Sequence, residues 1–439
     1  MANITKSVGL VYPYFRTSSS VQHLFHPLGI ASLSSQLKML GITVTQYDCT
    51  FSSFEEISNQ IIAQKPAIVG IYIMATLSRN ALHLLRLLRP KLPNTLFVAG
   101  GPLPTLYPER FSQKFDVVFK GESDGIFSKF CSDYLTNADR NNFSRKLDFL
   151  TYPGIYLRTA SSTIQQPPIH HDQRFIDSLP IPDRTQTDHE LYQEIWFNKI
   201  GYKPATILLT RGCPYQCDFC SKPVFGNHFR KRSLKSVFDE IADIKHHGYN
   251  QLWIADDSFT LDYDYLSGFC LEMIERNTGI SWTCLSRVDV PDPDIMHLMR
   301  RAGCVKVYLG LESGDNETLG LMKKRATVED GIRATYNFND AGIKVGAFFI
   351  VGYPGETIES VERTFSLAQS LPLDEISFNV PYPLPGSPLF SRLRGLNSDD
   401  DWDIENETKF LFESEFDSEW LKNKIEETMS KFKNKPIAH

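Results

Sequence analysis

Three cysteines lie close together in this chain, and their spacing suits one kind of chemistry. Cys213, Cys217 and Cys220 form a C-x3-C-x2-C run, whereas the other five cysteines are scattered, at 49, 131, 270, 284 and 304. Three thiolates on one short loop can face a single cuboidal iron–sulfur cluster, because soft sulfur ligands suit iron. Three ligands for four irons leave one iron open to bind another molecule.

Zinc is the alternative metal for such a run. Zinc sites usually use paired C-x2-C units and four protein ligands, and no second pair lies nearby. The spacing therefore favours an iron–sulfur cluster. The five scattered cysteines are interpreted as small buried hydrophobic residues, since a reducing compartment disfavours a framework of disulfides.

Residues 204–395 alternate short apolar runs with helical patterns, which predicts six βα units. The expected strands are 206–209, 251–255, 281–285, 305–309, 344–350 and 375–380. The helical patterns between them cover 234–246, 263–275, 292–301, 328–339 and 359–371. Six such units predict an α/β fold of the partial (β/α)6 barrel type, and barrels place functional residues where the strands end.

Polar or turn-forming residues follow all six of these strands. In strand order they are the cysteine run, Asp256 and Asp257, Arg287, Glu312 and Ser313, 352–356, and 381–383. Because parallel strands end at one rim of a barrel, we expect these residues to line the active site.

A cysteine loop of this spacing, after the first strand of a partial barrel, resembles the radical S-adenosylmethionine (SAM) superfamily. The resemblance implies a [4Fe–4S] cluster on Cys213, Cys217 and Cys220, whose open iron chelates the amino and carboxylate groups of SAM. It also implies that electron transfer cleaves SAM into methionine and a 5′-deoxyadenosyl radical. An electron donor such as flavodoxin or ferredoxin is therefore an expected partner.

The same resemblance implies how the rim would bind SAM. Phe219, before the last cysteine, matches the family position that packs near the adenine. Asp256 and Asp257 stand where the family places polar contacts to the amino group of SAM. Arg287 matches a basic position that could pair with the carboxylate.

A Gly-Leu-Glu-Ser-Gly run at 310–314 also matches a motif of this family. The match implies that Glu312 and Ser313 contact the ribose or methionine part of SAM. For all these polar residues, a helix cap or a surface pair is the structural alternative. The basic run Lys323–Arg325 is interpreted as a solvated charge run, with the carboxylate of SAM as a second possible contact.

Residues 1–135 form a second alternating pattern. Strands are expected at 8–12, 43–47, 68–73, 95–99 and 117–119, and helices at 28–40, 54–63, 79–88, 103–111 and 124–134. Five βα units predict a doubly wound, Rossmann-like parallel sheet. No G-x-G-x-x-G run follows the first strand and no Walker A sequence occurs, which disfavours nucleotide binding.

This front part resembles the cobalamin-binding domains that precede radical SAM barrels. The matching runs include His-Pro-Leu-Gly at 26–29, Val-Ala-Gly-Gly-Pro at 98–102, Gly-Glu-Ser-Asp at 121–124 and Leu-Pro-Ile-Pro-Asp-Arg at 179–184. The resemblance implies that Gly100, Gly101, Pro102 and Glu122 contact cobalamin, with the glycine turn admitting its bulky tail. The D-x-H-x-x-G run that ligates cobalt in other cobalamin domains is absent. A domain that keeps the fold without the cofactor is therefore the alternative.

The chain is accordingly divided into four parts. A cobalamin-binding domain covers 1–135, a Pro-rich polar linker with a small hairpin covers 136–203, the barrel covers 204–395, and a short helical tail covers 396–439. The 46 basic and 52 acidic residues give a net charge of −6 without a long basic run, so no nucleic-acid partner is expected. No apolar stretch is long enough to span a membrane and no export signal is evident, so a cytoplasmic location without membrane contact is expected.

Together the two resemblances imply a C-methyltransferase. One SAM would methylate cobalamin, and a second would yield the radical that activates an unactivated carbon of a small molecule or peptide. The alternative is a cyclase, ring-contraction or anaerobic oxidation enzyme of the same architecture that transfers no methyl group. A cobalamin-dependent sensor or scaffold is a third interpretation, which the intact cysteine loop disfavours.

Overall fold

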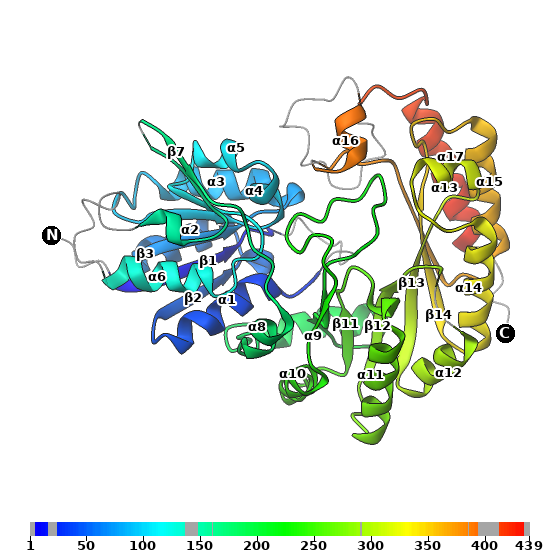
Figure 1. Cartoon of the computed structure of the whole chain (residues 1–439), viewed down its shortest axis with the longest axis horizontal. Coiled ribbons are helices and arrows are strands. Elements are labelled where there is room, and N and C mark those ends of the chain that lie inside the picture. The colour runs from blue at the N-terminus through cyan, green and yellow to red at the C-terminus, as the bar shows by residue number, and fades with distance from the viewer. Residues whose placement is uncertain are drawn as a thin grey trace. The chain divides into compact units, whose positions relative to one another are not determined.

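The computed structural model describes residues 5–15, 24–136, 148–159, 161–289, 292–384, 386–393 and 412–433 (Figure 1). The chain forms two compact units. The first comprises 1–203 and 222–247, and the second comprises 204–221 and 248–439. The residues expected to form a linker belong to the first unit, and so does the segment that follows the cysteine loop.

One mixed sheet of seven strands forms the centre of the first unit, in the order β2-β1-β3-β4-β5-β6-β7. The strands are β1 (Thr5–Tyr12), β2 (Thr43–Asp48), β3 (Pro66–Tyr72), β4 (Leu96–Gly100), β5 (Val117–Phe119), β6 (Ile155–Arg158) and β7 (Thr163–Gln165). The first five are parallel, and β6 and β7 form an antiparallel hairpin beside β5. The predicted doubly wound sheet and the predicted small hairpin are both confirmed.

Helices cover both faces of this sheet. They are α1 (Leu28–Met39), α2 (Phe54–Gln64), α3 (Ser78–Leu88), α4 (Pro102–Leu106), α5 (Pro108–Ser112) and α6 (Ile126–Thr136). The same unit contains α8 (Gln173–Ser178), α9 (His189–Ile200), α10 (Leu234–His246) and the two-residue strand β10 (Arg230–Lys231). α1 packs against α6, and α2 packs against α3. Val8, Leu10 and Phe119 are buried in one core with residues of α1 and α6.

Two details of the first unit differ from the predicted pattern. The single helix expected at 103–111 is two short helices, because Pro108 has no N–H to donate and restricts Tyr107 before it. α9 was not predicted, since only Tyr192 of its residues is buried and no apolar stripe marks it. Its ends are nevertheless well defined, by the side chain of Asp188 and by Gly201 at φ +73°.

A six-stranded parallel sheet forms the second unit, in the order β15-β14-β13-β12-β11-β8. Its strands are β8 (Pro204–Ile207), β11 (Gln251–Ile254), β12 (Ser281–Ser286), β13 (Cys304–Glu312), β14 (Lys344–Ile350) and β15 (Glu375–Asn379). α11 (Tyr263–Glu275), α12 (Pro293–Arg301), α14 (Val328–Asp340) and α15 (Ile358–Ser370) lie along the outer side of the sheet (Figure 1). The predicted partial barrel of six βα units is confirmed.

Shorter elements complete the second unit. They are β9 (Thr210–Arg211), α13 (Asn316–Leu321), α16 (Pro388–Arg392) and α17 (Ser418–Lys433). α17 packs on α15, where Leu421 joins a core with Phe365, and Lys424 lies 2.6 Å from Glu362. The expected helical tail is therefore present as α17. No helix in the described part of the chain is long and apolar enough to cross a membrane.

Candidate active site

The cysteine loop follows β8 and β9, at the carboxyl end of the first barrel strand. Cys217 is buried, and Cys213 and Cys220 are partly exposed. The other five cysteines are all buried, and burial raises the pKa of each thiol, for Cys270 to about 12. The prediction that these five are small core residues is confirmed.

The donor atoms of the loop fit a cluster better than a single ion. Within the described ranges, no three His, Cys, Asp or Glu side chains converge closely enough to hold one metal ion. A cuboidal cluster makes a different demand, because each of three thiolates binds a different iron and the sulfurs stay apart. The three thiols lie on one loop, as the spacing predicts, and their role as cluster ligands stays a prediction.

Asp218, inside the loop, is its main anchor. Its carboxylate is almost fully buried and accepts a 2.6 Å hydrogen bond from the hydroxyl of Tyr353 and a second bond from Arg392. Its backbone N–H donates to the carbonyl of Met322, and its carbonyl accepts from the N–H of Leu389, both at 2.9 Å. Four contacts thus tie one loop residue to three separate segments that follow later strands.

The backbone of Tyr353, whose hydroxyl binds Asp218, is itself fixed by a hydrogen bond. Its backbone N–H donates to a carboxylate oxygen of Glu356 at 2.7 Å. Burial raises the pKa of Glu356 to about 7, and burial together with the Asp218 carboxylate raises the pKa of Tyr353. The tyrosine hydroxyl therefore stays protonated and donates a hydrogen bond to the carboxylate of Asp218.

Arg287 is buried against the cysteine loop. One of its terminal nitrogens lies 3.8 Å from the sulfur of Cys217, and the other donates to the carbonyl of Lys324 at 2.6 Å. Its Nε donates to Asp289 at 2.7 Å, and the guanidinium lies 3.5 Å from the ring centroid of Tyr215. The sequence predicted a basic side chain at this rim of the barrel. In the structure the guanidinium of Arg287 lies next to the thiol of Cys217.

Asp256 fixes the segment that leads into the loop. Its two carboxylate oxygens accept bonds from the N–H of Leu209 at 2.8 Å and from the N–H and hydroxyl of Thr210 at 2.9 and 2.7 Å. Complete burial raises the pKa of Asp256 to about 7, although these bonds oppose the shift. Asp257 is exposed, so of the two only Asp257 presents its side chain to solvent.

Glu312 occupies a strained position at the end of β13. Its φ is +62°, in the left-handed region, which costs a non-glycine residue roughly 1–2 kcal/mol. The side chain is buried and pairs with Lys324 at 2.7 Å. A Cβ on Gly310 would lie 2.5 Å from the Glu312 carboxylate and 2.7 Å from the Lys324 amine, so glycine there makes room for the pair.

Ser313 and Phe219 both pack within the second unit. Ser313 lies 3.2 Å from the hydroxyl of Thr364 on α15 and accepts the N–H of Asp315. Phe219 packs on an apolar cluster that includes Met322 and Leu389. The expected contacts of both residues with SAM stay predictions.

In the first unit, the predicted cobalamin residues lie at the carboxyl ends of β4 and β5. A Cβ on Gly100 would meet no described atom within 4 Å, so open space lies beside it. Gly101 has φ +106°, and a Cβ there would lie 2.9 Å from the carbonyl oxygen of Ile73. A side chain at position 101 would therefore clash with the backbone after β3. At Gly100 the space beside the backbone is open, so this glycine leaves room for a ligand. Pro102 begins α4 directly after them.

Glu122 is buried in a charged cluster. One carboxylate oxygen lies 2.5 Å from Arg230 and 3.2 Å from His170. Arg230 also donates to the carbonyls of His171 and Phe225. The carboxylate thus organises the segment after the cysteine loop, and a contact with cobalamin stays a prediction.

Sequence reasoning missed four residues that shape this site. Asp218 and Arg392 carry no motif of their own, and Tyr353 was noted only as part of a turn. Lys324 was interpreted as solvated, which is wrong, because it is buried and ion-paired. Its neighbours Lys323 and Arg325 are exposed, as expected. Which of these three basic residues is buried depends on the backbone geometry of the turn, and the sequence alone does not give that geometry.

Two family models match this chain. The Radical SAM superfamily model matches residues 207–368, and the B12 binding domain model matches residues 18–130. The chain therefore combines a B12-binding domain with a radical SAM domain that follows it. Its cofactors are therefore a [4Fe–4S] cluster, SAM and cobalamin.

Among its relatives, the chain is 28% identical to an uncharacterized methyltransferase of Pyrococcus horikoshii, over 83% of this chain and 77% of the relative. It is 29% identical to the anaerobic magnesium-protoporphyrin IX monomethyl ester cyclase of Rubrivivax gelatinosus, over 84% of this chain and 66% of that enzyme. The structure of the radical SAM methyltransferase TsrM from Kitasatospora setae, with cobalamin and a [4Fe–4S] cluster bound, superposes with a TM-score of 0.73. That match has 21% identity and covers 88% of this chain and 74% of TsrM, so it supports the fold.

Replacing Gly100 tests where cobalamin enters the first unit. Gly100→Trp should fold, because its side chain enters open space, and it should block uptake of hydroxocobalamin by filling that space. Gly100→Ala is the matched control and should retain uptake. The measurement is the corrin absorbance that stays with the protein through gel filtration. Equal uptake by both variants would show that cobalamin does not occupy this space.

Weakening the Asp218 anchor should loosen the cysteine loop. Asp218→Asn keeps the shape of the side chain but loses charge-assisted bonds, each worth about 1.5–3 kcal/mol. After anaerobic reconstitution we expect this variant to lose iron faster to a chelator than the wild type. Asp374→Asn is the control, because Asp374 accepts only from the N–H of Val345, at the opposite end of the sheet. Identical iron release by all three proteins would contradict the anchoring role.

Proposed function

We propose that this enzyme methylates an unactivated carbon of a small molecule or peptide, using cobalamin and radical SAM chemistry. The observation that carries the proposal is the pairing, in one chain, of a B12-binding sheet with a barrel whose first strand ends in an anchored three-cysteine loop. When bound, the cluster and SAM supply a carbon-centred radical, and cobalamin supplies a methyl group for transfer.

In this proposal the thiolates of Cys213, Cys217 and Cys220 hold the cluster. Asp218 keeps their loop in one conformation, and Arg287 places a fixed positive charge beside the sulfur of Cys217. This positive charge therefore lies beside one of the three proposed cluster ligands. In this proposal the conformation of the cysteine loop is fixed before the cluster binds.

The remaining rim residues position SAM in the proposal. Asp257 and Ser313 offer polar atoms to the methionine part, and Phe219 offers a ring to the adenine. Glu312 is held by Lys324, so its carboxylate is oriented in advance for the ribose. Asp256 contributes indirectly, because its bonds to Leu209 and Thr210 shape the entry to the loop.

Gly100, Gly101, Pro102 and Glu122 form the proposed cobalamin contacts. Strand order reverses between β1 and β3, and doubly wound sheets bind ligands at the carboxyl ends of strands beside such a reversal. Gly100, at the end of β4, lies next to β3 and leaves open space. The proposal also keeps the four parts of the chain that the sequence predicts, with boundaries after residues 135, 203 and 395.

A cyclase that transfers no methyl group is the second candidate. The observation that favours it is the 29% identity to the cyclase of Rubrivivax gelatinosus over 84% of this chain. Methyltransferase relatives match comparable shares, which are 83% and 92% for the enzymes of Pyrococcus horikoshii and Chlorobaculum tepidum. The chemistry of the products must therefore separate the two candidates.

We also propose a flavodoxin or ferredoxin as electron donor and a location in the cytoplasm. No disulfide joins any of the eight cysteines, all of which lie in the described part of the chain, as expected of a reducing compartment. An oxygen-sensitive cluster, two of whose proposed ligands are partly exposed, also needs such a compartment.

Replacing the cluster cysteines tests the assignment of the loop. Alanine at Cys213, Cys217 or Cys220 should abolish 5′-deoxyadenosine formation and reduce bound iron from about four per protein. Cys270→Ala or Cys284→Ala should retain the iron, because these thiols lie in the core. Iron content is measured with and without SAM. Retained SAM cleavage in all three loop variants would overturn the assignment.

The ratio of products separates methylation from the cyclase alternative. Methylation consumes one SAM as methyl donor and one as radical source, so S-adenosylhomocysteine and 5′-deoxyadenosine should accumulate in equal amounts. The measurement uses the cobalamin-loaded enzyme, with lysate fractions of its host as the source of substrate and deuterated SAM as the label. Substrate-dependent 5′-deoxyadenosine without the homocysteine product would decide for the cyclase.

A further inference from the structure

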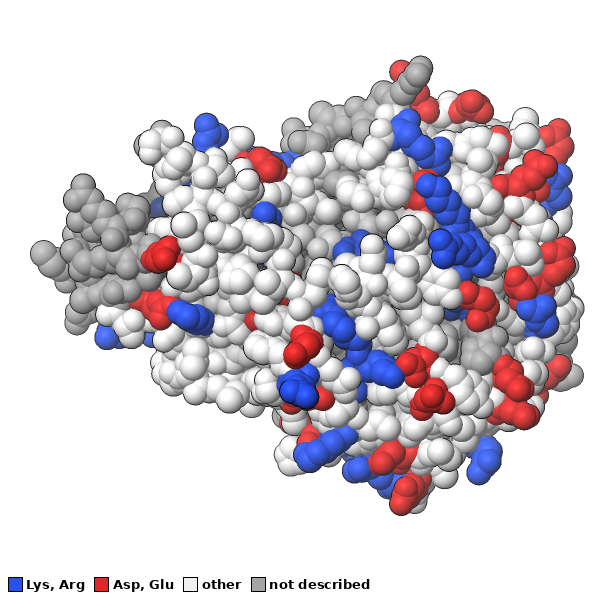
Figure 2. Space-filling model, viewed as in Figure 1, with Lys and Arg blue, Asp and Glu red and all other residues white. Residues whose placement is uncertain are grey.

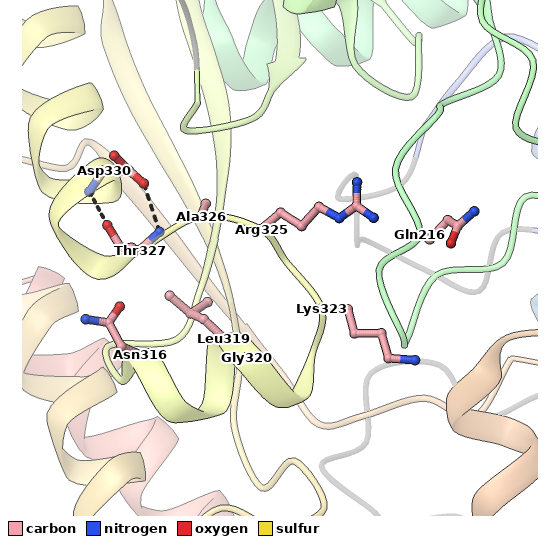
Figure 3. A pocket seen from close by; sticks show the side chains of 9 residues that line it. All are labelled: Gln216, Asn316, Leu319, Gly320, Lys323, Arg325, Ala326, Thr327 and Asp330. Atoms are coloured by element: carbon pink, nitrogen blue, oxygen red, sulfur yellow. Dashed lines mark hydrogen bonds between the residues drawn. The ribbon is translucent and has the colours of Figure 1, made fainter.

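A pocket of about 590 Å³ lies in the second unit, between the cysteine loop and the turn after α13 (Figure 3). It is lined by Gln216, Asn316, Leu319, Gly320, Lys323, Arg325, Ala326, Thr327 and Asp330. Gln216 stands between Cys213 and Cys217 in the sequence, so one wall of the pocket is the cysteine loop itself. None of the rim residues that position SAM in the proposed function lines this pocket.

The turn that borders the pocket has an unusual backbone. Lys323 and Arg325 both lie in the left-handed region, at φ +52° and +55°, where side chains other than glycine are strained. Between them, Lys324 turns inward to Glu312. The strained backbone therefore sends one base into the protein and its two neighbours outward.

The two outward bases have few acidic neighbours among the described residues. In the described part of the chain, no ion pair involves Arg325, and the only carboxylate oxygen near the Lys323 amine is that of Asp218, at 3.9 Å. Asp330, the acid of the pocket, is occupied by Thr327 and Arg333. In Figure 3 the side chains of Lys323 and Arg325 extend toward the loop that carries Gln216.

More basic side chains lie on the same face as the pocket, with acidic side chains beside them (Figure 2). Figure 2 shows basic side chains gathered over the region where Figure 1 draws α13. The whole chain carries a net charge of −6, so this positive surface is a local feature. Clustered charge of one sign steers oppositely charged proteins toward it.

We infer that Lys323 and Arg325 dock an acidic electron-transfer protein against the cysteine loop. The inference rests on the proposed function, in which the cluster needs an electron from outside. One electron leaves the reduced cofactor of the donor and enters the cluster, and no bond forms between the proteins. The pocket has no aromatic wall and its two bases are exposed, which suits a transient protein contact better than a small apolar ligand.

The test compares two electron sources. A reduced acidic flavodoxin depends on docking, whereas reduced methyl viologen is a small cation that does not need a basic surface. The double variant Lys323→Gln, Arg325→Gln removes both outward charges and leaves Lys324 in place. Arg301→Gln, Lys344→Gln is the matched control, because these exposed bases lie at the opposite end of the sheet, Arg301 shortly before β13 and Lys344 as the first residue of β14.

With flavodoxin at low ionic strength, the Lys323/Arg325 variant should form 5′-deoxyadenosine about tenfold more slowly than wild type. The difference should shrink as ionic strength rises from about 0.01 to about 0.15 M, which shortens the Debye length from about 30 to about 8 Å. With methyl viologen, the variant, the control and the wild type should give equal rates. Titration calorimetry should show weaker binding of oxidised flavodoxin to this variant alone.

Three results would overturn the inference. These are an unchanged flavodoxin rate, an equal loss with methyl viologen, or an equal loss in the control variant. If the wild type cleaves no SAM even with methyl viologen, the proposed function fails instead. Calorimetry with flavodoxin then still decides the docking inference, because binding needs no turnover.

Discussion

Asp218 stands inside the loop that carries the three cysteines, and its buried carboxylate is bound by Tyr353 and Arg392. A loop that must present several thiols to one inorganic cluster cannot also be free to move. Burying a carboxylate costs free energy unless donors satisfy it, so the bonds to Asp218 stabilise one arrangement and penalise others. The exits of later strands are thereby tied to the exit of the first, and the rim of the barrel becomes one connected structure.

The fold could be predicted because its periodicities are strong. The alternation of apolar runs with amphipathic runs was enough to predict ten helices and eleven strands. Among these elements, only the helix at 103–111 differs in kind, because it is two short helices in the structure. α9 could not be predicted in this way, since its contacts bury almost none of its side chains. Its signals were the cap residues at each end, which a search for apolar periodicity does not register.

For the site, the sequence could predict which residues gather and not what each one touches. Position after a strand was enough to bring Asp256, Arg287 and Glu312 to the rim. Hydrogen-bond partners depend on tertiary geometry, and so the carboxylate of Asp256 proved to bind the backbone at Leu209 and Thr210. The environment of Lys324 could not be predicted for the same reason. Its neighbours Lys323 and Arg325 have left-handed backbone conformations, and the Lys324 side chain between them points into the protein.

The segment 222–247 leaves the barrel sequence and belongs to the first unit, where Arg184 binds Glu240 and Arg230 binds Glu122. The chain therefore crosses between its units three times, and no single cut separates them. A gene fusion that exchanged the front part alone would remove Arg184 from Glu240 and Glu122 from Arg230. The front part and segment 222–247 are therefore coupled across the barrel sequence, and exchanging one without the other would break both of these ion pairs.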